Sequence, residues 1–141
     1  MAMRASLLLA CCLLLPCAGP VRAGDLLVVV NAHSGVEHLS RDQVVNLFMG
    51  RYREFPSGVV ALPIDQPSAE KSRFYRKLVG KELAEINAYW ARLYFSGKTS
   101  RPKQSAHGSE VVAWVAGHEG ALAYIDRGDL DDRMKVVLEL P

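Results

Sequence analysis

Cysteine is missing from most of this chain, because Cys11, Cys12 and Cys17 account for all three cysteines in 141 residues. The remainder can form no disulfide and offers no thiol nucleophile. There is no G-x-S-x-G motif and no evident Ser-His-Asp set, so hydrolase chemistry has no support. The four histidines lack helical ligand spacing, and the acidic turn at 126–132 lacks the ligand order of a calcium loop. We expect no metal, no cofactor and no catalysis.

An excess of one charge is also missing. The chain has 17 basic and 15 acidic residues, and two of the basic ones, Arg4 and Arg22, lie in its first segment. Beyond that segment the charges balance, which argues against nucleic-acid binding. No later apolar run is long enough for a membrane-spanning helix.

The first segment has the features of a secretory signal. Arg4 precedes an apolar run over residues 5–15, which is too short to cross a bilayer. Val21-Arg22-Ala23 then predicts cleavage before Gly24. Cys17 follows a proline, which is a poor context for lipidation. We therefore expect residues 1–23 to be a cleaved signal peptide and the rest to reach the periplasm without a lipid anchor.

Residues 24–141 suit one compact α/β domain. Leu26–Val30 is continuously apolar and β-branched, which is typical of a strand buried on both faces of a parallel or mixed sheet. Ser40 and Gln43 form a capping-box pattern before a helix that ends at Gly50. The other expected strands are 59–64, 121–125 and 134–140, and the other expected helices are 68–79, 82–95 and one capped by Ser109.

The turn before the second helix is the best candidate binding site. Ser68 is predicted to be the N-cap, with Glu70 in the first turn. The backbone N–H groups of Ala69, Glu70 and Lys71, with the Ser68 hydroxyl, are placed to hold a small oxyanion. Lys71, Ser72 and Arg73 could add donors. The alternative is that Ser68 only caps the helix and the cations are solvated.

A basic loop and several aromatic residues are weaker candidates. Lys98, Arg101 and Lys103 could attract an anion or an acidic partner, although such loops are commonly only solvated. Gly97-Lys98-Thr99 matches the end of a P-loop motif, but Arg92 occupies the position where that motif requires its first glycine. Nucleotide binding is therefore rejected. Helical spacing predicts that Trp90 belongs to the core. Tyr89 or Tyr94 is a candidate exposed contact.

Three phrases together resemble the phosphate-type (PstS-like) substrate-binding proteins of ABC transporters. The first is LSRDQVVNLFMG followed by VVALPIDQPSAEKSRFYRKLVG, the second is AYWARLYFSGKTSRP, and the third is VVAWVAGHEGALAYID. The resemblance covers nearly all of residues 24–141. It implies one lobe of a type 2 periplasmic-binding-protein-like fold, with a mixed central sheet flanked by helices. It also implies phosphate or a similar small anion as the ligand.

The candidate turn departs from that family pattern. Counting back from Phe74, Ser68 keeps the family's serine. Ala69 and Glu70 replace a Gly-Thr pair, and Ile64 stands where an arginine is usual. A glutamate repels phosphate, and the missing arginine removes a bidentate clamp.

Two functions follow. The first is an exported solute-binding-like protein that recognises phosphate or a similar oxyanion at Ser68–Arg73. The second is a ligand-free interaction module that docks on a membrane transporter or sensor through the loops Arg51–Phe55 and Lys98–Lys103.

Overall fold

The computed structural model describes residues 24–97 and 101–141, so the predicted signal peptide and Lys98 lie outside the described residues. Five strands form one mixed sheet in the order β3-β2-β4-β1-β5. β2 runs parallel to β3 and β4, and β1 runs antiparallel to β4 and β5. The strands are β1 Leu26–Asn31, β2 Leu62–Asp65, β3 Lys103–Gln104, β4 Ala121–Asp126 and β5 Met134–Leu140.

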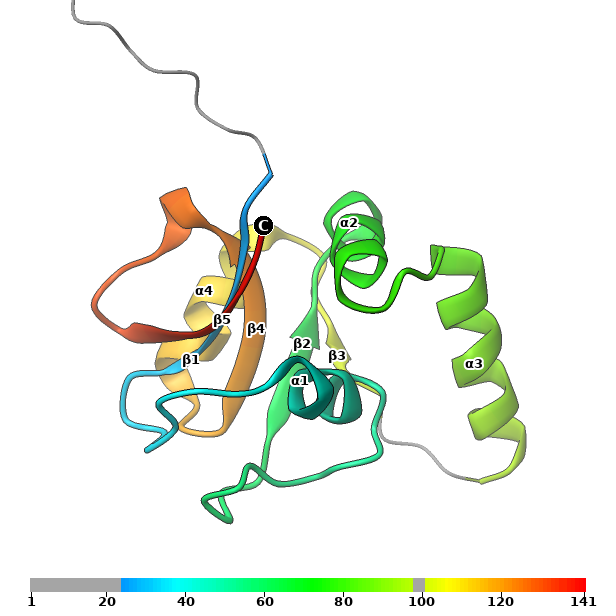
Figure 1. The fold of residues 1–141 in the computed structure, drawn as a ribbon, viewed down its shortest axis with the longest axis horizontal. Coiled ribbons are helices and arrows are strands. Elements are labelled where there is room, and N and C mark those ends of the chain that lie inside the picture. The colour runs from blue at the N-terminus through cyan, green and yellow to red at the C-terminus, as the bar shows by residue number, and fades with distance from the viewer. Residues whose placement is uncertain (1–23, 98–100) are drawn as a thin grey trace, which may run out of the picture.

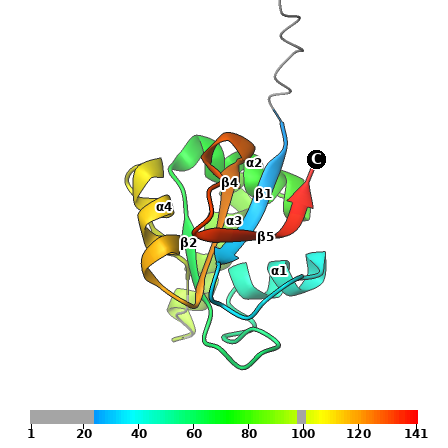
Figure 2. The ribbon, with the colours of Figure 1, turned by 90° about the vertical axis from the view of Figure 1, so that its left-hand side faces the viewer.

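Helices cover both faces of this sheet (Figures 1 and 2). α4 lies on one face, α1 and α2 lie on the other, and α3 packs outside α2. None of the helices in residues 24–97 and 101–141 has the length and apolar character needed to cross a membrane. The helices are α1 Arg41–Phe48, α2 Ser68–Val79, α3 Leu83–Phe95, α4 Gly108–Gly117 and the short 3-10 turn η1 Arg127–Asp129. The predicted α/β class, with a mixed sheet flanked by helices, is confirmed.

The buried strand predicted at Leu26–Val30 is the centre of the fold. All five of its apolar side chains are 0% exposed. Leu27 and Val29 point to the α4 side, whereas the other three join the core under α1 and α2. Burial on both faces explains why the run is apolar without alternation.

Four aromatic rings join the helices to the sheet. Phe74 of α2 stacks on Tyr124 of β4, with ring centroids 3.8 Å apart and an interplanar angle of 8°. Phe48 of α1 meets Phe74 edge-on at 4.8 Å, and Tyr75 meets both phenylalanines edge-on. All four rings are fully buried, so they fix the position of α2, which carries the candidate site.

The start of α1 and the start of β2 show how local hydrogen bonds set the boundaries of these elements. Ser40 and Gln43 form the predicted capping box. The strand predicted at 59–64 starts later, at Leu62, because the preceding residues pair with residues 53–55 instead. In that pairing Phe55 N–H donates to the Val59 carbonyl and Ala61 N–H donates to the Arg53 carbonyl.

Two predicted N-caps are wrong. α2 starts at Ser68 itself, its N-cap is Pro67, and no side chain caps it. α4 starts at Gly108, with His107 as N-cap, so Ser109 lies inside the helix. The actual N-cap lies one residue before Ser68 in α2 and two residues before Ser109 in α4. The preference of serine for N-cap positions does not fix a helix start to within one or two residues.

Candidate recognition sites

The end of β2 carries a fully buried carboxylate, Asp65, which is 0% exposed. Its Oδ1 accepts hydrogen bonds from the hydroxyls of Tyr75 at 3.1 Å and Tyr124 at 3.0 Å. Its Oδ2 accepts one from the Gln104 side chain at 3.2 Å and lies 3.5 Å from the Lys71 ammonium. Buried charges need partners of this kind, because desolvation is otherwise too costly.

Burial shifts the pKa values of this cluster. Desolvation raises the pKa of Asp65, and the nearby Lys71 ammonium and three hydrogen bonds oppose that shift. Burial, followed by the Asp65 charge, raises the pKa of Tyr75 and of Tyr124 well above the usual range. Both phenols therefore stay protonated and serve as hydrogen-bond donors to Asp65.

Lys71 is part of this internal cluster and is not a free donor for a ligand. It is 6% exposed, and its ammonium also donates to Gln104 Oε1 at 3.0 Å. One candidate cation of the predicted anion site is thus neutralised by the protein's own carboxylate. The sequence analysis missed Asp65 because it assigned this residue to a turn. The signal was present, since a carboxylate that ends an apolar strand requires a buried partner.

The remaining predicted residues belong to the first two turns of α2. Ser68 and Ala69 are exposed, and Glu70, Ser72 and Arg73 are partly buried. Arg73 donates to Asp126 at the end of β4, so its charge is also compensated. Its Nε is buried and has no hydrogen-bond partner within the described residues.

The free groups at this corner are mainly backbone. No side chain caps α2, and the first N–H that bonds within the helix is that of Lys71, to the Pro67 carbonyl. The N–H groups of Ser68, Ala69 and Glu70 precede this bond and are the unsatisfied donors of a helix start. They form an exposed helix end whose two nearest candidate cations, Lys71 and Arg73, already have carboxylate partners.

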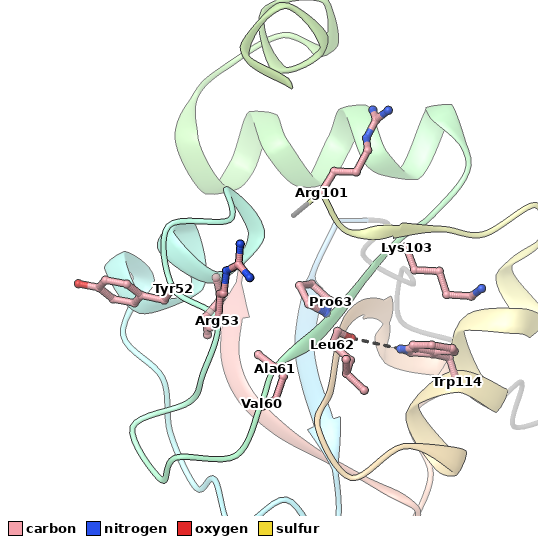
Figure 3. Close-up of a pocket in the computed structure, with 10 residues that line it drawn as sticks. Tyr52, Arg53, Val60, Ala61, Leu62, Pro63, Arg101, Lys103 and Trp114 are labelled. Atoms are coloured by element: carbon pink, nitrogen blue, oxygen red, sulfur yellow. Dashed lines mark hydrogen bonds between the residues drawn. The ribbon is translucent and has the colours of Figure 1, made fainter. Parts of the chain in front are cut away.

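A second candidate site lies at the other half of β2, in a groove that we call the basic groove. Its volume is about 260 Å³, and Figure 3 shows its residues placed around the start of β2. Three cations lie around it, and its lining contains no carboxylate. The lining residues are Leu47, Tyr52, Arg53, Val60, Ala61, Leu62, Pro63, Arg101, Lys103 and Trp114.

β3 is too short to cover β2, and this exposes the groove. It pairs only with Ile64 and Asp65, so the earlier part of β2 stays open. Val60 is 57% exposed, Leu62 is 37% exposed, and Tyr52 beside them is 52% exposed. Exposed apolar residues inside a ring of cations form a surface suited to an anion that also has apolar parts.

Trp114 forms one wall of the basic groove. Its indole N–H donates to the Leu62 carbonyl at 3.1 Å, and its ring stacks on His118 with centroids 3.7 Å apart. The Lys103 ammonium lies 4.9 Å from the centre of the ring. Within residues 24–97 and 101–141, none of Arg53, Arg101 and Lys103 lies within 4.0 Å of a carboxylate. These three charges are therefore available to a partner.

The basic groove brings together residues of the two segments through which the sequence analysis expected docking on a partner. Tyr52 and Arg53 come from the loop at 51–55, Arg101 precedes β3, and Lys103 begins β3. Sequence reasoning missed Trp114, Val60 and Leu62, because only the fold brings α4 and the start of β2 beside these loops.

The other sequence candidates are placed as follows. Trp90 is 5% exposed, so its predicted core position is confirmed. Tyr89 donates to the Met49 carbonyl at 2.7 Å, whereas Tyr94 is 70% exposed. In the part of the chain that the structure describes, no three His, Cys, Asp or Glu side chains are grouped so as to hold a metal ion.

No protein-family model matches the chain, and no curated protein matches it. Several solved structures, however, match the chain in fold. A Clostridium perfringens protein described as a phosphate ABC transporter substrate-binding protein, with bound phosphate, matches with a TM-score of 0.61 and 16% identity, over 79% of this chain and 43% of its own.

Two further solved structures match over 79% of this chain. An ABC-type phosphate transport receptor from Vibrio cholerae has a TM-score of 0.60, 15% identity and 44% of its own length covered. A protein from Planctomyces limnophilus described as phosphate-binding has a TM-score of 0.56, 16% identity and 40% of its length covered. The chain spans less than half the length of all three neighbours. Its fold is therefore that of a part of a periplasmic solute-binding protein.

Proposed function

We propose that this chain is an exported recognition module that binds an anion without catalysis, and that the basic groove is its main binding surface. The observation that carries the proposal is the set of three uncompensated cations around an exposed apolar floor. The fold supports a binding role, since its structural neighbours are described as substrate-binding or receptor proteins. The proposed export rests on the predicted signal sequence.

The expected affinity is modest. A unit charge about 4 Å from a cation in water gains about 1 kcal/mol, so three cations give about 3 kcal/mol at low salt. That corresponds to a dissociation constant in the millimolar range. Contacts of the ligand with Trp114, Tyr52 and Leu62 would tighten it. Because the cations are exposed, binding should weaken as salt is added.

An anion carried by a protein fits this groove better than free phosphate does. Tyr52 and Arg53 line the groove, as do Arg101 and Lys103, and the exposed apolar residues of the groove offer phosphate no polar contact. An acidic segment of a membrane transporter or sensor would use both the charges and the apolar floor. This corresponds to the second of the two functions expected from the sequence, docking on a membrane transporter or sensor.

Phosphate at the Ser68 corner is the second candidate function. It is favoured by the exposed first N–H groups of α2, by the unpaired Nε of Arg73, and by the phosphate bound to the Clostridium perfringens neighbour. The residues of this site would be Ser68, Ala69, Glu70, Lys71, Ser72 and Arg73. Against it stand the internal partners of Lys71 and Arg73 and the charge of Glu70.

One titration series separates the two candidates. The purified protein is titrated calorimetrically with a short polyglutamate peptide and with inorganic phosphate, with sulfate as the anion control. We expect peptide binding that falls about fivefold in Arg101→Ala, the equivalent of about 1 kcal/mol, and is retained in Ser68→Ala. Lys81→Ala, which removes an exposed cation outside the groove, is the matched control.

Each other result changes the conclusion. Saturable phosphate binding that is lost in Ser68→Ala moves the site to the α2 corner. Peptide binding that weakens equally in Arg101→Ala and Lys81→Ala indicates only a general charge effect and removes the groove from the proposal. If neither probe binds at low salt, the anion-recognition function is wrong.

A further inference from the structure

The outer face of α3 is uncharged along its centre and has no partner in the described chain. Ile86 and Trp90 turn inward and are buried. On the opposite side the residues at the centre of the exposed face are Ala84, Ala88, Ala91 and Phe95. Phe95 is 88% exposed and Tyr94 is 70% exposed, and the two rings contact each other edge-on. A solvent-facing helix surface normally carries charges at such positions.

The spacing of these four residues matches a helix-pairing seam. They follow one another at intervals of four, three and four residues, which is the a/d pattern of a two-helix coiled coil. Three alanines allow two helix axes to approach closely, since interaxial distance depends on the side chains at the contact. Figure 1 shows α3 on the outside of the molecule, with α2 between it and the sheet.

We propose that this face binds the same face of a second copy of the chain, with the two α3 helices antiparallel. In this arrangement Phe95 of each copy lies over Ala84 of the other, and the two copies of Ala88 and Ala91 meet at the centre. Such an interface is isologous, so one surface serves both copies.

The charges beside the seam favour a second copy in this orientation. Glu85 and Arg92 are seven residues apart and lie on the same flank of α3. Antiparallel pairing brings Glu85 of one copy near Arg92 of the other, twice across the two-fold axis. Parallel pairing would place this flank against Asn87 and Tyr94 and leave both charges unpaired. Glu85 Oε1 contacts Lys81 and Oε2 accepts the Glu82 N–H of the capping box. Its side chain is still 53% exposed, so a second cation can approach its carboxylate.

The area available suits a weak dimer. Burying Tyr94 and Phe95 on both copies removes about 600 Å² from water, at about 200 Å² for each ring when fully exposed. The alanine seam and the flanking residues must supply the rest of the roughly 1,000 Å² that a specific interface needs. We therefore expect self-association with a micromolar dissociation constant.

Sedimentation velocity of the purified protein over a range of concentrations tests the proposal. We expect a concentration-dependent dimer for the natural protein, and at least a tenfold weaker dimer for Ala88→Glu and for Phe95→Ser. Ser109→Glu introduces the same charge at an exposed position of α4 and should dimerise normally. Circular dichroism checks that each variant is folded.

A charge exchange tests the antiparallel register. Arg92→Glu puts two glutamates together at each end of the seam, and Glu85→Arg puts two arginines there, so each variant alone should dimerise weakly. Mixing the two variants creates opposite charges and should restore association as a heterodimer. A natural protein that stays monomeric at hundreds of micromolar overturns the proposal. So does a dimer unaffected by Ala88→Glu and Phe95→Ser, or a mixture that associates no better than its components.

Discussion

Replacing Lys71 by methionine should destabilise the protein strongly although both side chains have similar length. The ammonium of Lys71 lies 3.5 Å from Asp65 Oδ2, with side chains 8% and 1% exposed. Removing one partner of a buried ion pair costs about 3–5 kcal/mol, because the other charge stays desolvated. We expect the lower end of this range, about 3 kcal/mol, because Tyr75, Tyr124 and Gln104 still donate to Asp65.

The cost should depend on pH in a specific direction. Burial raises the pKa of Asp65 above its usual value of 3.8, and Lys71 opposes that shift. A raised carboxyl pKa means that the folded state holds the proton more tightly than the unfolded state. The contribution of Asp65 to the stability of the folded state is complete at pH values below its usual pKa. This contribution is lost as the pH rises through the raised pKa of the folded state. Without Lys71 the pKa rises further, so the deficit of Lys71→Met should widen as pH rises and close in acid.

Urea unfolding of the natural protein and Lys71→Met, at pH 7 and at pH 4, measures this difference. At pH 7 we expect a loss of about 3 kcal/mol, which corresponds to a fall in Tm of about 10 °C. The double variant Lys71→Met with Asp65→Asn removes the lone charge and should recover most of the loss. A deficit below about 1 kcal/mol at pH 7, or an equal deficit at both pH values, would refute the reasoning.

Three further changes test the packing by thermal unfolding. Gly120→Ala would place a methyl group against the Val60 backbone carbonyl and should cost at least about 2 kcal/mol; an unchanged Tm would contradict the close approach of these segments. Phe74→Ala removes the ring stacked on Tyr124 and should cost about 3–5 kcal/mol, whereas a loss near 1 kcal/mol would mean that the core collapses into the space. Ser40→Ala should cost about 1 kcal/mol through the capping box, and a neutral result would show that the cap is not formed in solution.

The sequence predicted the parts of the fold that depend on local pattern. The apolar run at 26–30 indicated a doubly buried strand, and Ser40 with Gln43 indicated the start of α1. The pattern did not show that β1 would run antiparallel to both of its neighbours, since strand direction depends on connections elsewhere. β3 was missed because two residues, Lys103 and Gln104, have no periodicity to read.

The candidate site was harder to predict than the fold. Ser68, Lys71 and Arg73 were chosen for chemistry that suits an anion, and their proximity in the structure agrees with their places on one helix. Sequence alone could not show that Asp65 and Asp126 would neutralise the two cations. Those pairs join residues on different strands and helices, so only the folded chain reveals which charges remain free.

The order of the strands has a consequence for how fast the protein folds. Among the described strands β1 comes first in sequence, yet it lies between β4 and β5, which come last, and it pairs with both. The centre of the sheet cannot form until β4 and β5 are available, because β1 has neither neighbour before then. These pairings join segments far apart in sequence, so the protein should fold slowly, as expected of high contact order.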